Sequence, residues 1–218
     1  MIKDDARDYN GGIADFDLDI EFNPNFWEAY NNRGYAKSQL EKYAEAISNY
    51  TKAMELNPHA EDVYNGRGQS EFHLKNYKGA IADYDKAIEL NPKYAAAWND
   101  RGQSKFSLAD YKGALADYNK AIELDPNFAP AYYNCGLLKH HLKNFTGALA
   151  DFSKAIELHS DERQDDLYFW RGNTKMELKD FGGAVADYTK VIELNPNHEF
   201  AHTNLIIAEN AVRDLRQK

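Results

Sequence analysis

Three histidines are the strongest candidates in this sequence for binding a metal ion, because two of them are adjacent and the third follows in the same part of the chain. His140 and His141 are neighbours, and His159 comes later in the chain. Adjacent side chains on a helix point about 100° apart, and neither His140 nor His141 has an acid or a cysteine four positions on to complete a set of metal ligands. We therefore predict surface histidines and no metal site.

No other group of residues is typical of catalysis. The sequence contains no paired nucleophile and base, no phosphate-binding loop and no metal-binding motif. Cys135 is the only cysteine, which excludes an internal disulfide, and its place in an expected helix predicts a buried small side chain instead of a reactive thiol. We predict a non-enzymatic protein with no catalytic residue and no cofactor.

The chain repeats itself every 34 residues. Residues 76–92, NYKGAIADYDKAIELNP, and residues 110–126, DYKGALADYNKAIELDP, agree at 13 of 17 positions. A fixed period of this length is typical of a stacked array in which each repeat contacts only its neighbours. Apolar residues recur at spacings of three and four in the second half of the repeat, which predicts an amphipathic helix, and we expect another helix in the first half.

The period predicts one solenoid domain over residues 1–218. Residues 8–24 match the second half of a repeat, and residues 197–218 form a closing first helix. The five full repeats are placed at 25–58, 59–92, 93–126, 127–160 and 161–196. The expected fold is all-α, with twelve helices.

A capping residue marks where the second helix of a repeat begins, and a proline follows where most of these helices end. A short polar side chain can accept from the free N–H groups of the first turn, and proline cannot continue a helix. The predicted caps are Asn76, Asp110, Asn144 and Asp180. Residues 159–166, HSDERQDD, join the fourth and fifth repeats without a proline, so we expect looser packing at that junction.

One glycine stands in the middle of the first helix of every full repeat. A glycine there costs about 1 kcal/mol relative to alanine, which favours a close approach by a neighbouring helix. The glycines are Gly34, Gly68, Gly102, Gly136 and Gly172, and the alanines expected opposite them are Ala46, Ala80, Ala114, Ala148 and Ala184.

Arginine precedes this glycine in four repeats, and most second helices carry an aspartate before their last aromatic residue. The arginines are Arg33, Arg67, Arg101 and Arg171, and the aspartates are Asp15, Asp83, Asp117, Asp151 and Asp187. A planar guanidinium suits a half-buried carboxylate, so we predict structural bridges between packed helices. The pattern leaves open whether each bridge forms within a repeat or between repeats.

A second stripe of residues runs along each first helix, beside the stripe expected in the core. Solvated helix faces seldom carry aromatic residues in register, which favours a binding surface over a plain solvated face. The residues of this stripe, called the stripe residues below, are Asn31, Tyr35, Asn65, Gln69, Phe72, Asn99, Gln103, Phe106, Tyr133, Leu137, His140, Phe169 and Asn173.

The repeat resembles the tetratricopeptide repeat over about residues 8–218. The shared features are an aromatic four residues before the glycine, an alanine twelve residues after it, a further aromatic, a second alanine and a closing proline. The resemblance implies a right-handed α-solenoid of antiparallel helix pairs. This chain departs from the family in having arginine before the glycine, where leucine is frequent.

In tetratricopeptide arrays the second stripe lines a concave groove, so the resemblance implies a scaffold that binds an extended peptide. We expect Asn31, Asn65 and Asn99 to bond the peptide backbone, and the aromatic stripe residues to contact its side chains. Family members that bind acidic chaperone tails use lysine and arginine in this groove. The stripe has neither, so the expected partner is a neutral or basic protein or peptide.

Two alternative roles remain open at this point. The chain could assemble with itself through the solenoid ends, weakly at most, because Asp15, Asp17 and Asp19 surround the apolar residues of 8–22. It could also be the repeat region of a larger protein.

Composition narrows the remaining classes of partner. The formal net charge is −9, with acids spread along the helices, which argues against a nucleic-acid partner. No apolar run reaches the length of a membrane span, and the first ten residues contain no signal-peptide core. The expectation is a cytoplasmic protein without a membrane partner.

Overall fold

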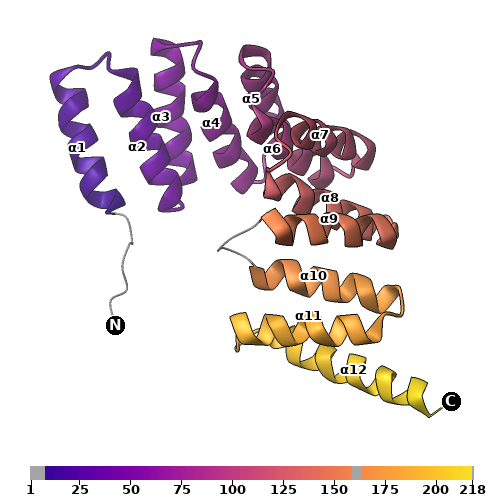
Figure 1. Cartoon of the computed structure of the whole chain (residues 1–218). Coiled ribbons are helices and arrows are strands. Elements are labelled where there is room, and N and C mark those ends of the chain that lie inside the picture. Colours follow the sequence, from indigo (N-terminus) through magenta and orange to yellow (C-terminus); the bar gives the residue numbers. More distant parts are fainter. Residues whose placement is uncertain (1–7, 159–163, 218) are drawn as a thin grey trace. The chain divides into compact units, whose positions relative to one another are not determined.

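The computed structural model describes residues 8–158 and 164–217, which form twelve α-helices and no strand (Figure 1). The predicted all-α fold of antiparallel helix pairs is confirmed. The helices are α1 (Tyr9–Phe22), α2 (Trp27–Gln39), α3 (Tyr43–Leu56), α4 (Glu61–His73), α5 (Tyr77–Leu90), α6 (Ala95–Ser107), α7 (Tyr111–Leu124), α8 (Ala129–His141), α9 (Phe145–Leu158), α10 (Gln164–Glu177), α11 (Phe181–Leu194) and α12 (Glu199–Arg216). His159 and most of the junction predicted to be loose lie outside the described residues.

The chain divides into two compact units, Met1–Asp117 (unit 1) and Tyr118–Lys218 (unit 2). In unit 1, helices α1 to α6 pack in chain order, and the first helices α2, α4 and α6 also contact one another in turn. In unit 2, helices α8 to α12 pack in chain order, and α8 also contacts α10. Neighbouring first helices therefore lie side by side within each unit, which aligns their stripes.

The predicted caps of the second helices are confirmed. In each case the side-chain Oδ1 accepts a hydrogen bond from the backbone N–H three residues later, at 2.9 to 3.3 Å. The caps are Asn76, Asp110, Asn144 and Asp180. These bonds satisfy N–H groups that a helix leaves without a partner at its start.

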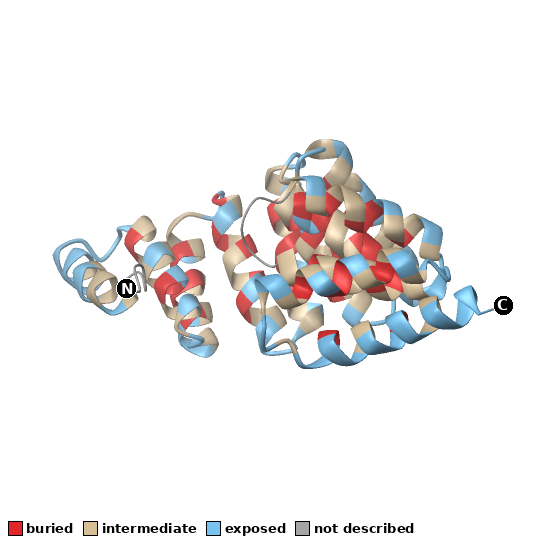
Figure 2. Ribbon diagram, turned by 60° about the horizontal axis from the view of Figure 1, so that its bottom comes forward, coloured by how far each residue is buried: buried red, intermediate tan, exposed pale blue. Residues whose placement is uncertain are grey.

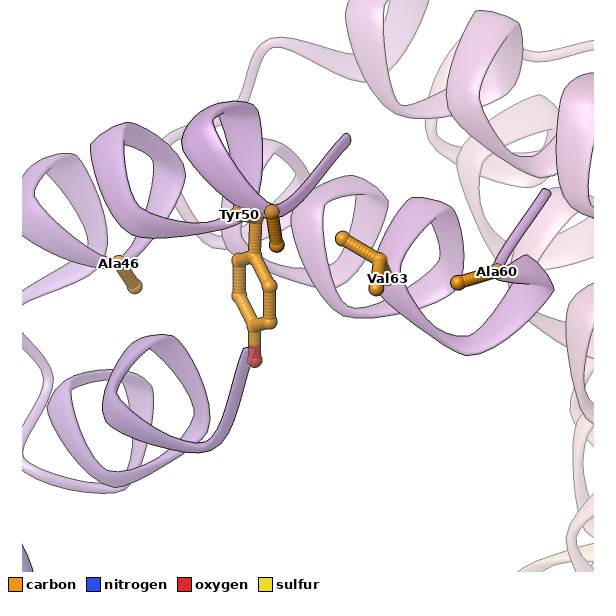
Figure 3. Packing of buried hydrophobic residues seen from close by; sticks show 5 residues of the cluster. Ala46, Tyr50, Ala60 and Val63 are labelled. Atoms are coloured by element: carbon orange, nitrogen blue, oxygen red, sulfur yellow. The ribbon is translucent and has the colours of Figure 1, made fainter. Parts of the chain in front are cut away.

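The core combines alanines with one large ring from the second helix of each full repeat. In the cluster around α3, Ala46, Tyr50 and Ala53 pack against Ala60 and Val63 at the start of α4 (Figure 3). The buried residues lie where helices face one another, whereas α1 has no buried residue and α12 has only Ala201 and Ala208 (Figure 2). Small residues thus let the helices approach, and the rings fill the space between them.

Four of the mid-helix glycines face these rings, and ring atoms, not alanine atoms, are the nearest that an added Cβ would meet. A Cβ added to Gly68 would lie 2.7 Å from Cε1 of Tyr84, and one added to Gly172 would lie 2.8 Å from Cε1 of Tyr188. Gly34 and Gly136 face Tyr50 and Phe152 in the same way. The close approach is therefore present, and its nearest side chain lies one turn after the predicted alanine.

The arginine bridges form within a repeat and also reach the repeat before. Nε and Nη2 of Arg67 donate to the two carboxylate oxygens of Asp83 at 2.9 and 2.6 Å. Nη1 of Arg67 donates to Thr51 Oγ1 on α3, at 3.1 Å. The same pairing within a repeat joins Arg171 to Asp187, at 2.9 and 2.6 Å. Arg67 therefore bridges both within its own repeat, to Asp83, and between repeats, to Thr51.

Replacing Gly68 by alanine tests the contact between glycine and ring. The Gly68→Ala variant should lose about 1–3 kcal/mol of unfolding free energy, because its Cβ would overlap the buried Tyr84 ring. Gly182→Ala is the matched control, since a Cβ there meets nothing within 4 Å and the substitution should cost nothing. Urea unfolding of both variants measures the difference, and equal losses would contradict this packing.

Candidate functional site

The stripe residues lie on the first helices of both units. In unit 1 they lie on α2 (Asn31, Tyr35), α4 (Asn65, Gln69, Phe72) and α6 (Asn99, Gln103, Phe106). In unit 2 they lie on α8 (Tyr133, Leu137, His140) and α10 (Phe169, Asn173). Contacts between α2 and α4, between α4 and α6, and between α8 and α10 bring these residues together within their own unit.

Two stripe asparagines of unit 1, Asn31 and Asn65, bond to carboxylates of the neighbouring first helix. Asn31 Nδ2 donates to Asp62 Oδ2 at 3.1 Å, across from α2 to α4. Asn65 Nδ2 lies 3.5 Å from Asp100 Oδ2, across from α4 to α6. Asn65 and Asn99 are only 4% and 2% exposed. A hydrogen bond from either of them to a peptide backbone stays a prediction.

Asp100 is a residue of this face that sequence reasoning missed. Its Oδ2 also accepts from Gln69 Nε2 at 2.8 Å, and its Oδ1 accepts from Asn99 Nδ2 at 3.1 Å. Three stripe amides thus converge on one carboxylate. The available signal was a departure from the repeat, because the equivalent positions hold Asn32, Gly66, Asn134 and Trp170.

The aromatic stripe residues of unit 1 lie against the start of the following helix or against α1. Phe72 packs on Tyr77 with 5.4 Å between ring centroids, and Phe106 packs on Tyr111 with 5.6 Å. Tyr35 is 46% exposed and meets Tyr9 of α1 edge to face at 6.3 Å. Gln103 is half-buried on α6. Part of each ring therefore stays at the surface.

In unit 2, three stripe residues pack against the buried core with part of their side chains. Tyr133 and Leu137 pack on the cluster that contains Phe152. Phe169 contacts Tyr188 with 6.1 Å between ring centroids and His198 with 4.6 Å. Each of the three stripe side chains keeps intermediate exposure.

A hollow of about 290 Å³ opens beside Asn173 in unit 2. Asn173 Oδ1 accepts from Tyr188 Oη at 2.8 Å and from Asn204 Nδ2 at 3.0 Å, which joins α10 to α11 and α12. The lining residues are His140, Asn173, Met176, Glu177, Tyr188, Asn204 and Ile207. Two stripe residues thus belong to a real depression that offers both polar and apolar contacts.

His140 is half-buried between aromatic rings. Its Nδ1 lies 3.0 Å from Thr174 Oγ1, and that hydroxyl donates to the Trp170 carbonyl at 2.7 Å, so His140 is the donor to Thr174. Phe145 and Trp170 lie edge to face with the imidazole at 5.2 and 5.5 Å. Burial lowers the pKa of His140, with Glu177 raising it and His141 lowering it by smaller amounts.

Acid should destabilise unit 2 through His140. Its pKa is lower in the fold than in the unfolded chain, so unfolding takes up a proton as the pH falls below about 6.5. Stability is therefore full above that pH and falls as the pH drops through the window between the two pKa values. His140→Gln should flatten the decline in melting temperature between pH 7 and pH 5, and an unchanged decline would contradict this assignment.

The other candidates for chemistry give no reactive site. Burial and the nearby Asp151 raise the pKa of Cys135 to about 12, so the thiol stays protonated at neutral pH. Among residues 8–158 and 164–217, no group of three or more histidine, cysteine, aspartate or glutamate residues could hold a metal ion. No helix in the described part of the chain is long and apolar enough to cross a membrane.

The helix pairs and the stripe that recurs on their first helices define an α-helical repeat protein. Comparison with models of protein families identifies the repeat family. Models described as "Tetratricopeptide repeat" match residues 27–60, 61–94, 129–161 and 165–198, and a model described as "TPR repeat" matches residues 102–143. The matches span more than half of the sequence. The chain belongs to the tetratricopeptide repeat family.

Several solved structures are similar to this chain. A crystal structure of MamA is 26% identical, covers 69% of this chain and 88% of its own, and has a TM-score of 0.62. YrrB, described as a TPR protein with an unusual peptide-binding site, is 25% identical, with coverages of 86% and 96% and a TM-score of 0.62. The first TPR of Spaghetti (RPAP3), bound to the HSP90 peptide SRMEEVD, is 30% identical, with coverages of 54% and 93% and a TM-score of 0.52. Curated protein sequences give no significant match.

Proposed function

We propose that this protein is a non-enzymatic interaction scaffold that binds an extended peptide segment of a partner on the first-helix faces of its units. The family supports a role in protein interaction: YrrB is described as having an unusual peptide-binding site, and the Spaghetti repeat is bound to an HSP90 peptide. The ligand contacts in this chain are assigned to the stripe residues, which combine amides with partly exposed rings.

The hollow in unit 2 is the observation that carries the proposal. It places the half-exposed Ile207 and Met176 beside Asn173, Asn204 and the carboxylate of Glu177. Apolar side chains of a peptide can fill such a depression while amides bond its backbone. Ile207 is 51% exposed, which leaves an apolar contact surface for a partner.

The charge of the first helices favours a neutral or basic ligand. Their arginines and several of their lysines already pair with aspartates of second helices, as in Arg171 and Lys175 with Asp187 at 2.6 and 2.8 Å. The carboxylates of Asp62 and Asp100 receive only amide donors from the described residues. An acidic segment such as the one bound by the Spaghetti repeat would meet repulsion here.

A substitution at Ile207 tests the proposal. The probe is a phage-displayed library of short random peptides, selected on the whole chain and then titrated as individual synthetic peptides. Ile207→Asp should weaken binding of the peptides that contact unit 2 by at least about tenfold, because a charge would replace the apolar wall of the hollow.

Leu194→Asp is the matched control, since Leu194 is an exposed aliphatic residue of α11 that does not line the hollow. It should leave the affinity and the melting temperature unchanged. A library without any enriched peptide, or equal affinities for both variants, would contradict the proposal.

Self-association through α1 is a second candidate function. Leu18 and Phe22 are 64% and 96% exposed on this helix, beside the acids Asp15, Asp17 and Asp19. We expect a weak dimer that Phe22→Ser abolishes, as measured by sedimentation equilibrium. A wild-type chain that stays monomeric over a wide concentration range would exclude this role.

A further inference from the structure

Asp100 lies where three amides from two helices meet. Asn65 and Gln69 of α4 donate to Oδ2, at 3.5 and 2.8 Å, and Asn99 of α6 donates to Oδ1 at 3.1 Å. Amide N–H groups stabilise the ionised form of a carboxyl group, whereas burial, the larger effect here, raises the pKa of Asp100. The fold thus holds a partly desolvated carboxylate in one orientation.

No cation in the described part of the chain compensates this charge. No lysine, arginine or histidine nitrogen of residues 8–158 or 164–217 forms an ion pair with Asp100 or with Asp62. Arg101, the next residue in the sequence, is occupied by Asp85 and Asp117, at 2.6 and 2.7 Å. The three amides offset part of the cost of burying this carboxylate, and a cation supplied by a ligand would offset more of it.

The side-chain oxygen of Asn65 is a second observation that points to a ligand here. Asn65 is 4% exposed and lies beside Asp100, and its Oδ1 accepts no hydrogen bond from the residues that the structure describes. Leaving a buried acceptor without a partner is costly, and native structures rarely tolerate it without a reason. An unsatisfied amide oxygen next to a carboxylate is chemically suited to a hydrogen-bond donor with positive charge.

We propose that unit 1 binds a lysine side chain of its peptide partner, with the ammonium group placed between Asp100 Oδ1 and Asn65 Oδ1. This inference rests on the proposed peptide-binding function and specifies its ligand. Asp100 Oδ2 already accepts two N–H groups, whereas Oδ1 accepts one from Asn99 and has a lone pair left. A compact ammonium with three donors suits one free site on each of two oxygens better than the paired donors of arginine do.

The surroundings of Asp100 extend the negative region along unit 1. Burial raises the pKa of Tyr94, and the carboxylates of Asp100 and Asp62 raise it further, so both acids act on the same ring. Asp62 is itself exposed and is oriented by Asn31. A second carboxylate therefore lies in the same part of unit 1, and its charge adds to the attraction of a lysine.

The test uses pools of short random peptides that carry one fixed central residue: lysine, Nε-acetyl-lysine, arginine or norleucine. Each pool is titrated against the whole chain. The lysine pool should bind at least about tenfold more tightly than the acetyl-lysine and norleucine pools, because only its side chain brings charge-assisted hydrogen bonds. The arginine pool should fall between them.

Asp100→Asn should remove the preference for lysine over acetyl-lysine, and Glu89→Gln should keep it. Glu89 is an exposed acid of α5, so the control makes the same change in net charge away from the site. Comparing peptide pools on the wild-type chain also keeps the test valid if Asp100→Asn is unstable.

Equal binding of the lysine and acetyl-lysine pools would overturn the lysine site while leaving the peptide-binding function intact. A lysine preference that survives in a folded Asp100→Asn variant would also overturn it. If none of the pools binds, the proposed function itself fails, and the lysine site fails with it.

Discussion

The stacking of helices in this chain depends on one interaction, in which an arginine of a first helix bonds to side chains of two second helices. Arg101 donates through Nε and Nη2 to Asp117, at 2.8 and 2.7 Å, and through Nη1 to Asp85, at 2.6 Å. Its guanidinium also lies 4.6 Å from the ring centroid of Trp98, one turn earlier on α6. Because the donors of arginine are fixed in one plane, few placements of the neighbouring helices satisfy all of these contacts together.

The exceptions to this pattern show what the interaction requires. Cys135 replaces the arginine in α8, and there Lys139 pairs with Asp151 at 2.6 Å. In the first full repeat an asparagine replaces the aspartate, so Arg33 donates to Asn49 at 2.7 Å and pairs with Asp17 of α1. Asp83, Asp117, Asp151 and Asp187 thus each pair with a cation from the first helix of their own repeat. These cations are occupied there, which leaves the stripe of unit 1 with amides and acids.

Local features of this fold could be predicted from the sequence, whereas the side-chain contacts between packed helices could not. The cap at Asp180 depends only on residues within one turn, and the pattern located it. The glycines indicated a close approach, but the sequence does not show at what height two helices cross, so Tyr84 was missed as the partner of Gly68. Asp100 was missed because the other repeats have no aspartate at its position. Its three amide partners also converge only once α4 and α6 are packed.

A double-mutant cycle on Arg67 and Asp83 tests the central claim most directly. The unfolding free energies of the wild type, Arg67→Met, Asp83→Ala and the double variant give the coupling energy between the two side chains. The bidentate geometry and the 7% exposure of the Asp83 side chain predict a coupling of about 2 kcal/mol or more. The exposed pair Lys86–Glu89 should show less than about 0.5 kcal/mol. Additive losses at Arg67 and Asp83 would contradict the account.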